Sequence, residues 1–548
     1  MRAVKVVLGL LFLFCLGESF AQQPSQTKKI EKRIAKGVEN SFNSNVRISP
    51  YDTVRKRAAN GVFSGIVVTA EGHVLTAAHA TKPGSVYQVT FPDGKNYLAV
   101  GLGRMGFRKD KTTYDVAMMK ITDKGTWAYA QMGWIGAAKV NQPALSISYP
   151  GSFRGLKPNL RVGRLLDLNY ESGYIITSCK MEPGDSGGSL FDIEGRLLGI
   201  HSKIDRNEDR NYEVPIDFYR KYWTALNVAK DYKELPEEDQ LPPVEALAMD
   251  TIPAISQLIA FPKKQGRAVY AIQSMQGDQT INILGTAIEF GSETYVVSKS
   301  TMVGEQPVLA VSEKKVDLIV LARDKENDLV LLKPAQKINH GIKLRATDVS
   351  VKLNQQALGR FLVSPFANDK KKVGVLSTEY LEMPLRSSVG NFGANATFIN
   401  EKVTITNISR GSGAEPYLKL QDQIIKINDV PMLKPADYGA ELAKCIAGDS
   451  VSLEVVRDGQ PLQLKVYLPA QPPVRHVASQ FDGGRSTRSD GFKQVLVQDA
   501  AIKKDECGGP VFDADGNFYG INIARHSRTS TIIMPADVIK TFINTNIK

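Results

Sequence analysis

Cysteine is scarce in this sequence, with four residues among 548. Cys15 falls in the amino-terminal apolar run, and the others are Cys179, Cys445 and Cys507. Three cysteines at such spacings fit neither a disulfide framework nor a zinc site. We therefore expect hydrophobic cores to stabilise the chain. We also expect no metal site and no organic cofactor.

Long hydrophobic runs and concentrated charge of one sign are missing as well. Beyond the amino terminus, no apolar run is long enough to cross a bilayer. The net charge is +12, but the 69 basic residues are scattered, with the tightest clusters at residues 28–33 and 370–372. No basic groove interleaved with aromatic residues accompanies these clusters. We therefore expect neither nucleic acid as a partner nor a stable membrane span.

The first 21 residues have the pattern of a secretory signal peptide. Positive residues precede an apolar run at residues 6–16, and a small-x-small cleavage site ends at Ala21. A membrane anchor is the alternative, but the run is short for a span and a cleavage site follows it. The sequence thus predicts an exported protein, either periplasmic or secreted.

The composition of the remaining chain indicates mostly β structure in two regions. From residue 59 to about residue 226, short β-rich segments alternate with Gly, Asp and Asn, which predicts a barrel or a sandwich. A polar, acidic and proline-containing stretch at residues 230–243 indicates an exposed linker. A second β-rich region begins near residue 268.

Blocks of the first region recur in the second region in the same order. Residues 72–79 correspond to 293–300, residues 114–120 to 327–333, and residues 184–188 to 505–509. Several separated blocks in one order indicate an internal duplication. The interval between the last two blocks is far longer in the second region, so the extra residues, roughly 388–470, indicate an inserted domain.

Three motifs in the first region carry the residue types of nucleophilic catalysis. His79 ends the segment Thr-Ala-Ala-His, Asp115 precedes an apolar run, and Ser186 lies in Gly-Asp-Ser-Gly-Gly. A serine hydroxyl needs a base to take its proton, a group to orient that base, and donors for the oxyanion. We predict that Ser186 is the nucleophile, His79 the base and Asp115 the orienting group, with the amides of Gly184 and Ser186 as the oxyanion hole.

These residues resemble the trypsin-like serine peptidase family, whose members have the order His, Asp, Ser. The strand patterns resemble its bacterial HtrA-like branch, fully over residues 55–225 and in degraded form over residues 268–545. The resemblance implies a double β-barrel in each region and polypeptide substrates, and it leaves a homo-oligomer open. The Ile-Val-Gly-Gly start of trypsin-like zymogens is missing, so activation by a freed amino terminus is not expected and Asp185 has no evident partner.

Substrate preference is suggested by a resemblance to bacterial glutamyl endopeptidases. His201 lies in a Gly-Ile-His setting that in those enzymes belongs to the substrate pocket, and Lys180 and Met181 fall near the same pocket. Such a histidine would favour an acidic side chain before the cut. The alternative is a histidine at a strand edge without selectivity.

The second region has lost the residues of this chemistry. By the correspondence of blocks, Ser300 takes the base position, Cys507 takes the nucleophile position, and Asp328 stays with nothing to orient. A cysteine needs a nearby base or positive charge to become reactive. We predict a catalytically dead protease-like domain that is kept as a scaffold.

The insert resembles a PDZ domain. Phe392, Gly393 and Ala394 match the carboxylate-binding loop imperfectly, and residues 420–429 resemble the family's leucine–aspartate–isoleucine–asparagine–glycine segment. The resemblance implies that peptide C-termini bind by adding a strand to an open edge. The alternative is a PDZ-shaped spacer with a closed groove.

The predicted fold class is mostly β, with two trypsin-like double β-barrel domains, the second degenerate, and an inserted α+β PDZ domain. The predicted units are a signal peptide at 1–21, an amino-terminal extension at 22–47, the active protease domain at 48–228, a linker at 229–262, the degenerate domain at 263–387 and 472–548, and the PDZ domain at 388–471. The predicted function is that of an exported serine endopeptidase with a PDZ module for peptide capture or regulation. The alternative is a peptide-binding or chaperone scaffold that does not cleave.

Overall fold

The computed structural model describes residues 26–547 except 155–156, 171, 243–250, 253, 255–256, 258, 260–262, 312–313, 346–352, 367–369 and 473–475. The predicted signal peptide at 1–21 lies outside the described residues. None of the helices in these ranges is long and apolar enough to cross a membrane.

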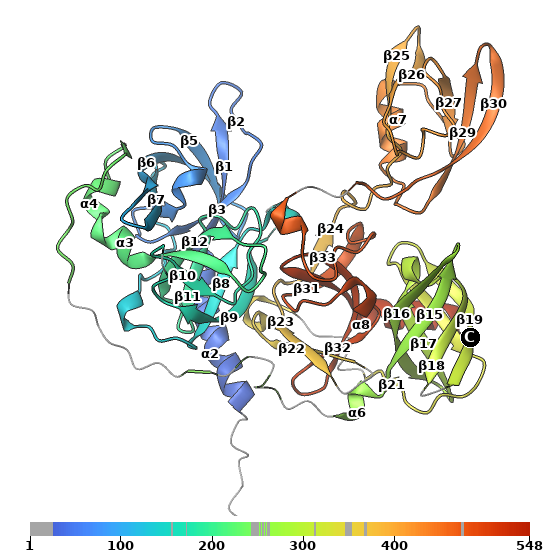
Figure 1. Cartoon of the computed structure of the whole chain (residues 1–548), viewed down its shortest axis with the longest axis horizontal. Coiled ribbons are helices and arrows are strands. Elements are labelled where there is room, and N and C mark those ends of the chain that lie inside the picture. The colour runs from blue at the N-terminus through green and yellow to red at the C-terminus, as the bar shows by residue number, and fades with distance from the viewer. Residues whose placement is uncertain are drawn as a thin grey trace, which may run out of the picture.

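The first unit is a six-stranded barrel near the amino terminus (Figure 1). Its strands run in the order β6-β5-β1-β3-β4-β7, and β6 also pairs with β7. They are β1 (Asn45–Asp52), β3 (Phe63–Val67), β4 (His73–Thr76), β5 (Val86–Thr90), β6 (Asn96–Lys109) and β7 (Thr112–Ile121). Along β6, buried and more exposed side chains alternate as a half-buried strand requires. The short β2 (Arg57–Ala58) pairs with β1 outside this order.

The second unit is a closed barrel in the order β10-β13-β12-β11-β8-β9. Its strands are β8 (Pro143–Ser148), β9 (Asn159–Asp167), β10 (Ile175–Thr177), β11 (Ser189–Asp192), β12 (Leu197–Ile204) and β13 (Asn211–Pro215). The helices α3 (Ile216–Lys221) and α4 (Trp223–Leu226) follow it. We call these two barrels the first copy.

The second copy repeats the plan of the first. Its first barrel has the order β15-β18-β19-β20-β17-β16, and β15 also pairs with β16. The strands are β15 (Val269–Gln276), β16 (Gln279–Phe290), β17 (Glu293–Lys299), β18 (Glu305–Val311), β19 (Lys314–Asp324) and β20 (Leu329–Pro334), with β21 (Ile342–Lys343) at one edge and α6 (Lys263–Gly266) before them.

The remaining half of the second copy is a sheet in the order β23-β22-β32-β33-β34-β31-β24. Its strands are β22 (Phe361–Pro365), β23 (Lys371–Val375), β24 (Leu381–Met383), β31 (Phe492–Gln498), β32 (Pro510–Asp513), β33 (Phe518–Ser527) and β34 (Ser530–Pro535), followed by α8 (Ala536–Asn546). The PDZ domain is inserted between β24 and β31.

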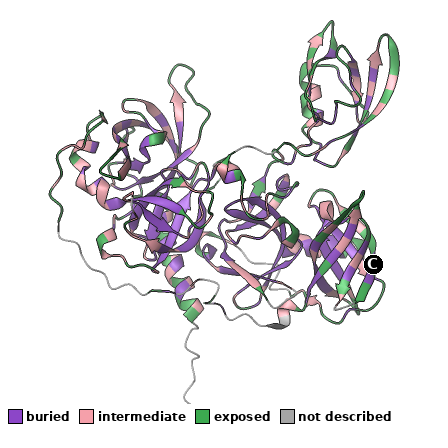
Figure 2. Cartoon of the chain, viewed as in Figure 1, coloured by how far each residue is buried: buried purple, intermediate pink, exposed green. Residues whose placement is uncertain are grey.

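The PDZ domain stands apart from the barrels (Figure 1). Its sheet has the order β25-β26-β27-β29-β30, so β25 is an edge strand. The elements are β25 (Ala394–Ile399), β26 (Lys402–Ile408), β27 (Gln423–Ile427), β28 (Val430–Pro431), α7 (Pro435–Leu442), β29 (Ser450–Arg457) and β30 (Gln460–Tyr467). Figure 2 shows that much of its strand surface is exposed or intermediate, whereas buried residues concentrate in the barrels.

One hydrophobic core joins the two copies through the helix α2 (Gln26–Ser41). Ile30 and Ile34 on α2 belong to the same buried cluster as Leu160 of the first copy and Phe361 of the second. Polar contacts reinforce this arrangement, because the amide of Phe361 donates to a Glu31 carboxylate oxygen at 2.8 Å. The second barrel of the first copy, α2 and the sheet of the second copy therefore pack as one body.

The predicted fold class is confirmed: the described chain is mostly β, with six-stranded barrels and a PDZ insert, although the second half of the second copy is a seven-stranded sheet. Two segments differ in detail from the expectation. β1 begins at Asn45, inside the predicted amino-terminal extension, because Val46 and Ile48 belong to the first barrel's core. Within the predicted linker, β14 (Asp231–Tyr232) pairs in parallel with β6, so this part lies against the barrel.

Candidate active site

The two barrels of the first copy bring His79, Asp115 and Ser186 together at their junction. His79 lies in the short helix η2 (Ala78–Ala80) that follows β4, and Asp115 lies on β7, which pairs with β4. Ser186 comes from the loop between β10 and β11 of the second barrel. Each side chain therefore sits on a different segment and is held by a different set of strand hydrogen bonds.

The three side chains are linked by hydrogen bonds, with His79 between Asp115 and Ser186. His79 Nδ1 is 2.8 Å from Asp115 Oδ2, and His79 Nε2 is 3.0 Å from Ser186 Oγ. The hydrogen bond with Asp115 raises the pKa of His79 above its usual value, although burial of the ring acts in the opposite direction. Burial raises the pKa of Asp115, but hydrogen bonds from His79 and Ser202 outweigh it and lower this pKa overall.

Ser202 is a member of this site to which the sequence analysis gave no role. Its Oγ donates to Asp115 Oδ2 at 2.5 Å, and it follows His201 directly on β12. The amide of His79 donates to the other carboxylate oxygen of Asp115 at 2.9 Å. Asp115 is thus held by three donors in all, which fixes the direction in which it presents its charge to the imidazole.

The nucleophile loop, residues 182–188, contains the amides of Gly184 and Ser186, which we predicted to form the oxyanion hole. The carbonyl of Pro183 accepts a hydrogen bond from the amide of Gly151 at 2.7 Å. Because the trans peptide is planar, the amide of Gly184 then points away from Gly151. Gly184 has a φ of +99°, and a Cβ there would lie 2.4 Å from the Gly151 nitrogen, so glycine is required. No described carbonyl accepts a backbone hydrogen bond from the amides of Gly184 or Ser186.

Asp185, which lacked a partner in the sequence analysis, pairs with Arg161 on β9. Arg161 Nη1 is 2.7 Å from Asp185 Oδ2, and both side chains are 1% exposed. Ser148 Oγ donates to the other oxygen of Asp185 at 2.8 Å, and the amide of Glu182 donates to Asp185 Oδ2 at 2.7 Å. Burial alone would lower the pKa of Arg161, but the pairing with Asp185 raises it overall. The positive charge that pairs with Asp185 of the nucleophile loop is therefore supplied by Arg161, a residue of the second barrel itself.

The residues predicted for substrate specificity lie deeper than expected. His201 is fully buried, its Nε2 is 2.7 Å from Ser146 Oγ, and burial lowers its pKa to about 3. A buried neutral imidazole presents no positive charge to an acidic substrate side chain. Met181 is also buried. Lys180 is partly exposed and forms an ion pair with Glu208 at 2.7 Å.

In the second copy, Thr301 rather than Ser300 stands at the place of His79. The amide of Thr301 donates to Asp328 Oδ1 at 2.8 Å, as that of His79 does to Asp115. The predicted correspondence was shifted by one residue at this position. Asp328 also has a partner, since its carboxylate meets the fully buried amine of Lys299. A fixed ion pair thus replaces the carboxylate–imidazole pair.

Cys507 occupies the position of Ser186 in a sealed environment. Its side chain is fully buried, and its Sγ lies 3.6 Å from the Lys503 carbonyl oxygen. Burial raises the pKa of its thiol, although the charge of Lys299 opposes this. Protonation and burial both disfavour nucleophilic attack. No group of three or more His, Cys, Asp or Glu residues that could hold a metal ion occurs in the described ranges.

The predicted carboxylate loop of the PDZ domain lies at the start of the edge strand β25. Phe392 is buried, Gly393 has a φ of +69°, and Ala394 is the first residue of the strand. Tyr438, on α7, donates its hydroxyl to the Ala394 carbonyl at 2.7 Å. Its ring meets that of Phe392 edge-on, with the centroids 6.1 Å apart. A tyrosine therefore bridges the helix and the edge strand between which a peptide strand would insert.

We predict that Arg161→Met strongly destabilises the protein. The substitution keeps an apolar stem of similar length but leaves the Asp185 carboxylate buried without its cation, which costs about 3–5 kcal/mol. Urea denaturation followed by tryptophan fluorescence measures the change in the free energy of unfolding. Arg164→Met on the same strand is the control, because Arg164 reaches only the partly buried Asn141 side chain. Equal stability of the two variants would argue against a structural role for the pair.

Two family comparisons agree with this arrangement. Residues 63–200 match the trypsin-like peptidase domain family, and residues 386–468 match the PDZ domain family. The first match contains the triad region of the first copy, and the second coincides with the inserted domain.

Curated relatives are named as serine proteases. A probable periplasmic serine endoprotease DegP-like of Marinomonas sp. (strain MWYL1) is 24% identical over 411 residues, which are 73% of this chain and 77% of that protein. The putative serine protease HhoB of Synechocystis sp. is 28% identical over 31% of this chain and 40% of its own length. With a DegP-like relative from Ectopseudomonas mendocina the match spans 27% of this chain and 31% of that protein, at 29% identity.

Among solved structures, the HtrA-type protease AlgW with tripeptide aligns over 80% of this chain and 98% of its own, at 15% identity and a TM-score of 0.30. That score is too low to bear on the fold, so the conclusion depends on the sequence families and the curated relatives. The chain is therefore a serine protease with a trypsin-like peptidase domain and a PDZ domain, and it is similar to proteins named DegP-like periplasmic endoproteases.

Proposed function

We propose that this chain is an exported endopeptidase that cleaves polypeptides with one catalytic triad, His79, Asp115 and Ser186. The observation that carries the proposal is the continuous contact from Asp115 through His79 to Ser186, at 2.8 and 3.0 Å. Export is supported by the amino-terminal sequence pattern and by relatives that are named periplasmic.

The proposed reaction uses each residue in a definite role. His79 Nε2 takes the proton of Ser186 Oγ as that oxygen attacks the carbonyl carbon of the scissile peptide bond. The amides of Gly184 and Ser186 stabilise the oxyanion, and Asp115 stabilises the imidazolium. His79 then gives the proton to the leaving amine, and water hydrolyses the acyl-enzyme by the same route.

We propose that the second copy does not catalyse. The support is chemical, since no imidazole occupies the place of His79, Asp328 is paired with Lys299, and Cys507 is sealed from solvent. The alternative function, a peptide-binding or chaperone scaffold without cleavage, is disfavoured by the different state of the same positions in the first copy. There, the three side chains remain in mutual contact and His79 stays half exposed.

The PDZ domain is proposed to capture peptide C-termini at the edge of β25. The open edge and the positive φ of Gly393 support this role. A bound strand would compete with the Tyr438 hydroxyl for the carbonyl of Ala394. We propose that Tyr438 weakens capture while its hydroxyl occupies this carbonyl.

A fluorophosphonate probe distinguishes an enzyme from a scaffold. We expect labelling of the wild-type chain at one site and complete loss of labelling in Ser186→Ala, because Ser186 is partly exposed and its hydroxyl lies 3.0 Å from His79, whereas Ser146, which lies 2.7 Å from His201, is fully buried. Cys507→Ala should label like the wild type and serves as the control. Failure of the wild-type chain to react at any pH or temperature tested would favour the scaffold.

The labelling rate should rise with pH through a midpoint above 6.5. Protonated His79 cannot accept the serine proton, and its hydrogen bond with Asp115 raises the pKa at which the imidazole becomes neutral. Asp115→Asn should lower both the midpoint and the rate, the latter by about 10³-fold to 10⁴-fold. His73→Gln, outside the triad, should leave the midpoint in place. A midpoint that does not move in Asp115→Asn would exclude His79 as the titrating base.

Tyr438→Phe should open the peptide groove of the PDZ domain. Removing the hydroxyl frees the Ala394 carbonyl for a peptide amide, which should tighten binding about 2-fold to 10-fold. Fluorescence anisotropy with a labelled hexapeptide ending in a free carboxylate measures this in the full chain. The same peptide as a C-terminal amide and the exposed Tyr417→Phe variant are the controls. Unchanged affinity in Tyr438→Phe would show that the tyrosine does not close the groove.

A further inference from the structure

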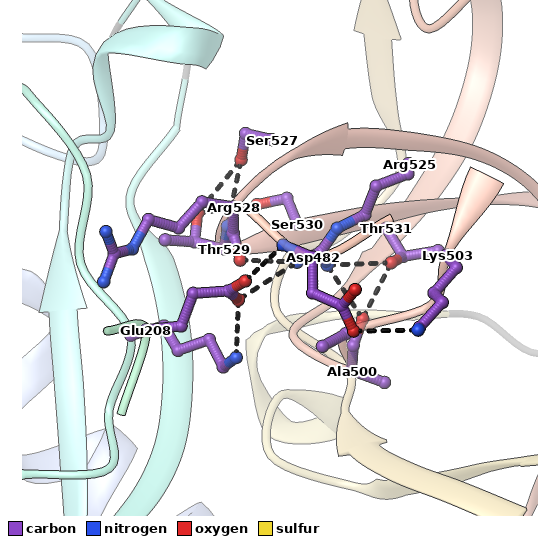
Figure 3. Close-up of polar contacts among 12 residues, drawn as sticks. Glu208, Asp482, Ala500, Lys503, Arg525, Ser527, Arg528, Thr529, Ser530 and Thr531 are labelled. Carbon is purple, nitrogen blue, oxygen red and sulfur yellow. Dashed lines mark hydrogen bonds and ion pairs between the residues drawn. The ribbon is translucent and has the colours of Figure 1, made fainter. Parts of the chain in front are cut away.

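A hairpin of the second copy lies beside Glu208 of the first copy (Figure 3), and its turn contacts the nucleophile loop. It consists of β33, β34 and the turn between them, and we call it the docking hairpin. Arg528 in its turn is fully buried and donates to the carbonyls of Asp205 and Asn207, at 2.7 and 3.2 Å. These two carbonyls belong to the segment between β12 and β13, next to the strand that carries Ser202.

Thr529, the next residue of the turn, contacts the nucleophile loop directly. Its Oγ1 donates to Glu182 Oε2 at 3.0 Å, across 347 residues of sequence. The other oxygen of Glu182 accepts from the amide of Ser152 at 3.0 Å, and Glu182 is only 5% exposed. A carboxylate so deeply buried needs such donors. One of the two comes from the second copy.

Glu182 is coupled to the oxyanion hole by short backbone links. Its amide donates to Asp185 at 2.7 Å, and its carbonyl accepts from the amide of Asp185 at 3.1 Å. Pro183 and Gly184 follow it directly. A shift of Glu182 therefore changes the orientation of the Gly184 amide, which is one of the two proposed oxyanion donors.

Two further contacts hold the same region from the second copy. His526 Nε2 lies 3.2 Å from the carbonyl of Ser152, the residue whose amide donates to Glu182. The amide of Asp482 donates to Glu208 at 2.7 Å, and Glu208 in turn pairs with Lys180. The loops on both sides of Ser186 thus have partners in the second copy.

We propose that the docking hairpin of the second copy is a positioning element that holds the oxyanion hole of the first copy in its competent conformation, with Thr529 acting through Glu182. The inference rests on the proposed peptidase function. In this proposal the second copy supports catalysis by the first copy without contributing a catalytic residue. Preorganised donors are worth most when the protein fixes them before the reaction begins.

Removal of one hydroxyl tests this inference in the full chain. Thr529→Val keeps the shape of the side chain but removes the hydrogen bond that Thr529 donates to Glu182 Oε2. We expect kcat on a fluorogenic peptide to fall about tenfold, because a displaced oxyanion donor weakens only the transition state. KM should stay within about twofold, and a peptide boronic acid, which forms the tetrahedral adduct, should bind about tenfold more weakly. Thr529→Ser retains the hydroxyl and should restore all three values.

The control is Thr286→Val, which removes a buried threonine hydroxyl within the second copy. Thr286 donates to the carbonyl of Gly508 at 2.7 Å, so its loss perturbs the second copy equally without reaching the first. A wild-type kcat in Thr286→Val together with a reduced kcat in Thr529→Val supports the inference. Equal losses in both variants, or none in Thr529→Val, would overturn it.

The outcomes separate this inference from the proposed function. If fluorophosphonate does not label the wild-type chain, the peptidase function itself fails. If it labels the wild type but not Ser186→Ala, and Thr529→Val reacts at the wild-type rate, the function stands and the positioning role fails. Glu182→Gln should lose activity like Thr529→Val, and the double variant should lose no more than either one, since both act through a single contact.

Discussion

The buried ion pair between Arg161 and Asp185 is the constraint on which the rest of the first active site depends. Two charges out of water are tolerable only when each is fully paired and hydrogen-bonded. Asp185 meets this requirement through Arg161, Ser148 and the amide of Glu182. The same contacts fix the backbone on both sides of Gly184. The position of the nucleophile loop is thus set by a requirement for charge compensation inside the second barrel.

The two copies hold different residues at corresponding positions of a similar fold. Asp115 and Asp328 each accept a backbone hydrogen bond from the residue at the base position, at 2.9 and 2.8 Å. The aspartate therefore holds the backbone at the base position in both copies. This structural role does not require a histidine at that position. In the second copy, the amine of Lys299 satisfies the carboxylate internally. The hairpin of this second copy, which we propose does not catalyse, contacts the first copy.

The sequence allowed the fold class to be predicted. It also pointed to His79, Asp115 and Ser186, each in a short block beside a strand, and the structure brings these side chains together at 2.8 and 3.0 Å. Motifs of this kind consist of residues that are adjacent in the sequence, so they can be recognised without knowledge of the tertiary structure. The one-residue error at Ser300 arose because the strand register is fixed by pairing with a distant strand: Ser298 pairs with Val330 as Thr76 pairs with Ala117, which places Thr301 at the position of His79. A short sequence block therefore identifies the types of residue at a site, but it does not fix which residue of one copy corresponds to which residue of the other.

Other features of the site depend on contacts between segments that are far apart in the chain, and the local sequence gives few indications of them. Arg161 offered a hint, since it is a charged residue on an otherwise buried stretch of strand and needs a buried acid. The contact of Thr529 with Glu182 spans 347 residues, and the contact of Tyr438 with Ala394 depends on how a helix packs on an edge strand. No pattern of spacing encodes either one. The burial of His201 likewise follows from barrel closure.

The helix α2 has a consequence for the order in which the chain acquires its structure. It is the first described element to leave the ribosome, yet its partners include Leu160 and, much later, Phe361. More than three hundred further residues therefore have to be synthesised and exported before the apolar face of α2 is fully buried. Contacts of such long range form slowly. The first copy can thus reach its final stability only after the second copy has been made, so the folding of the two copies is coupled through α2.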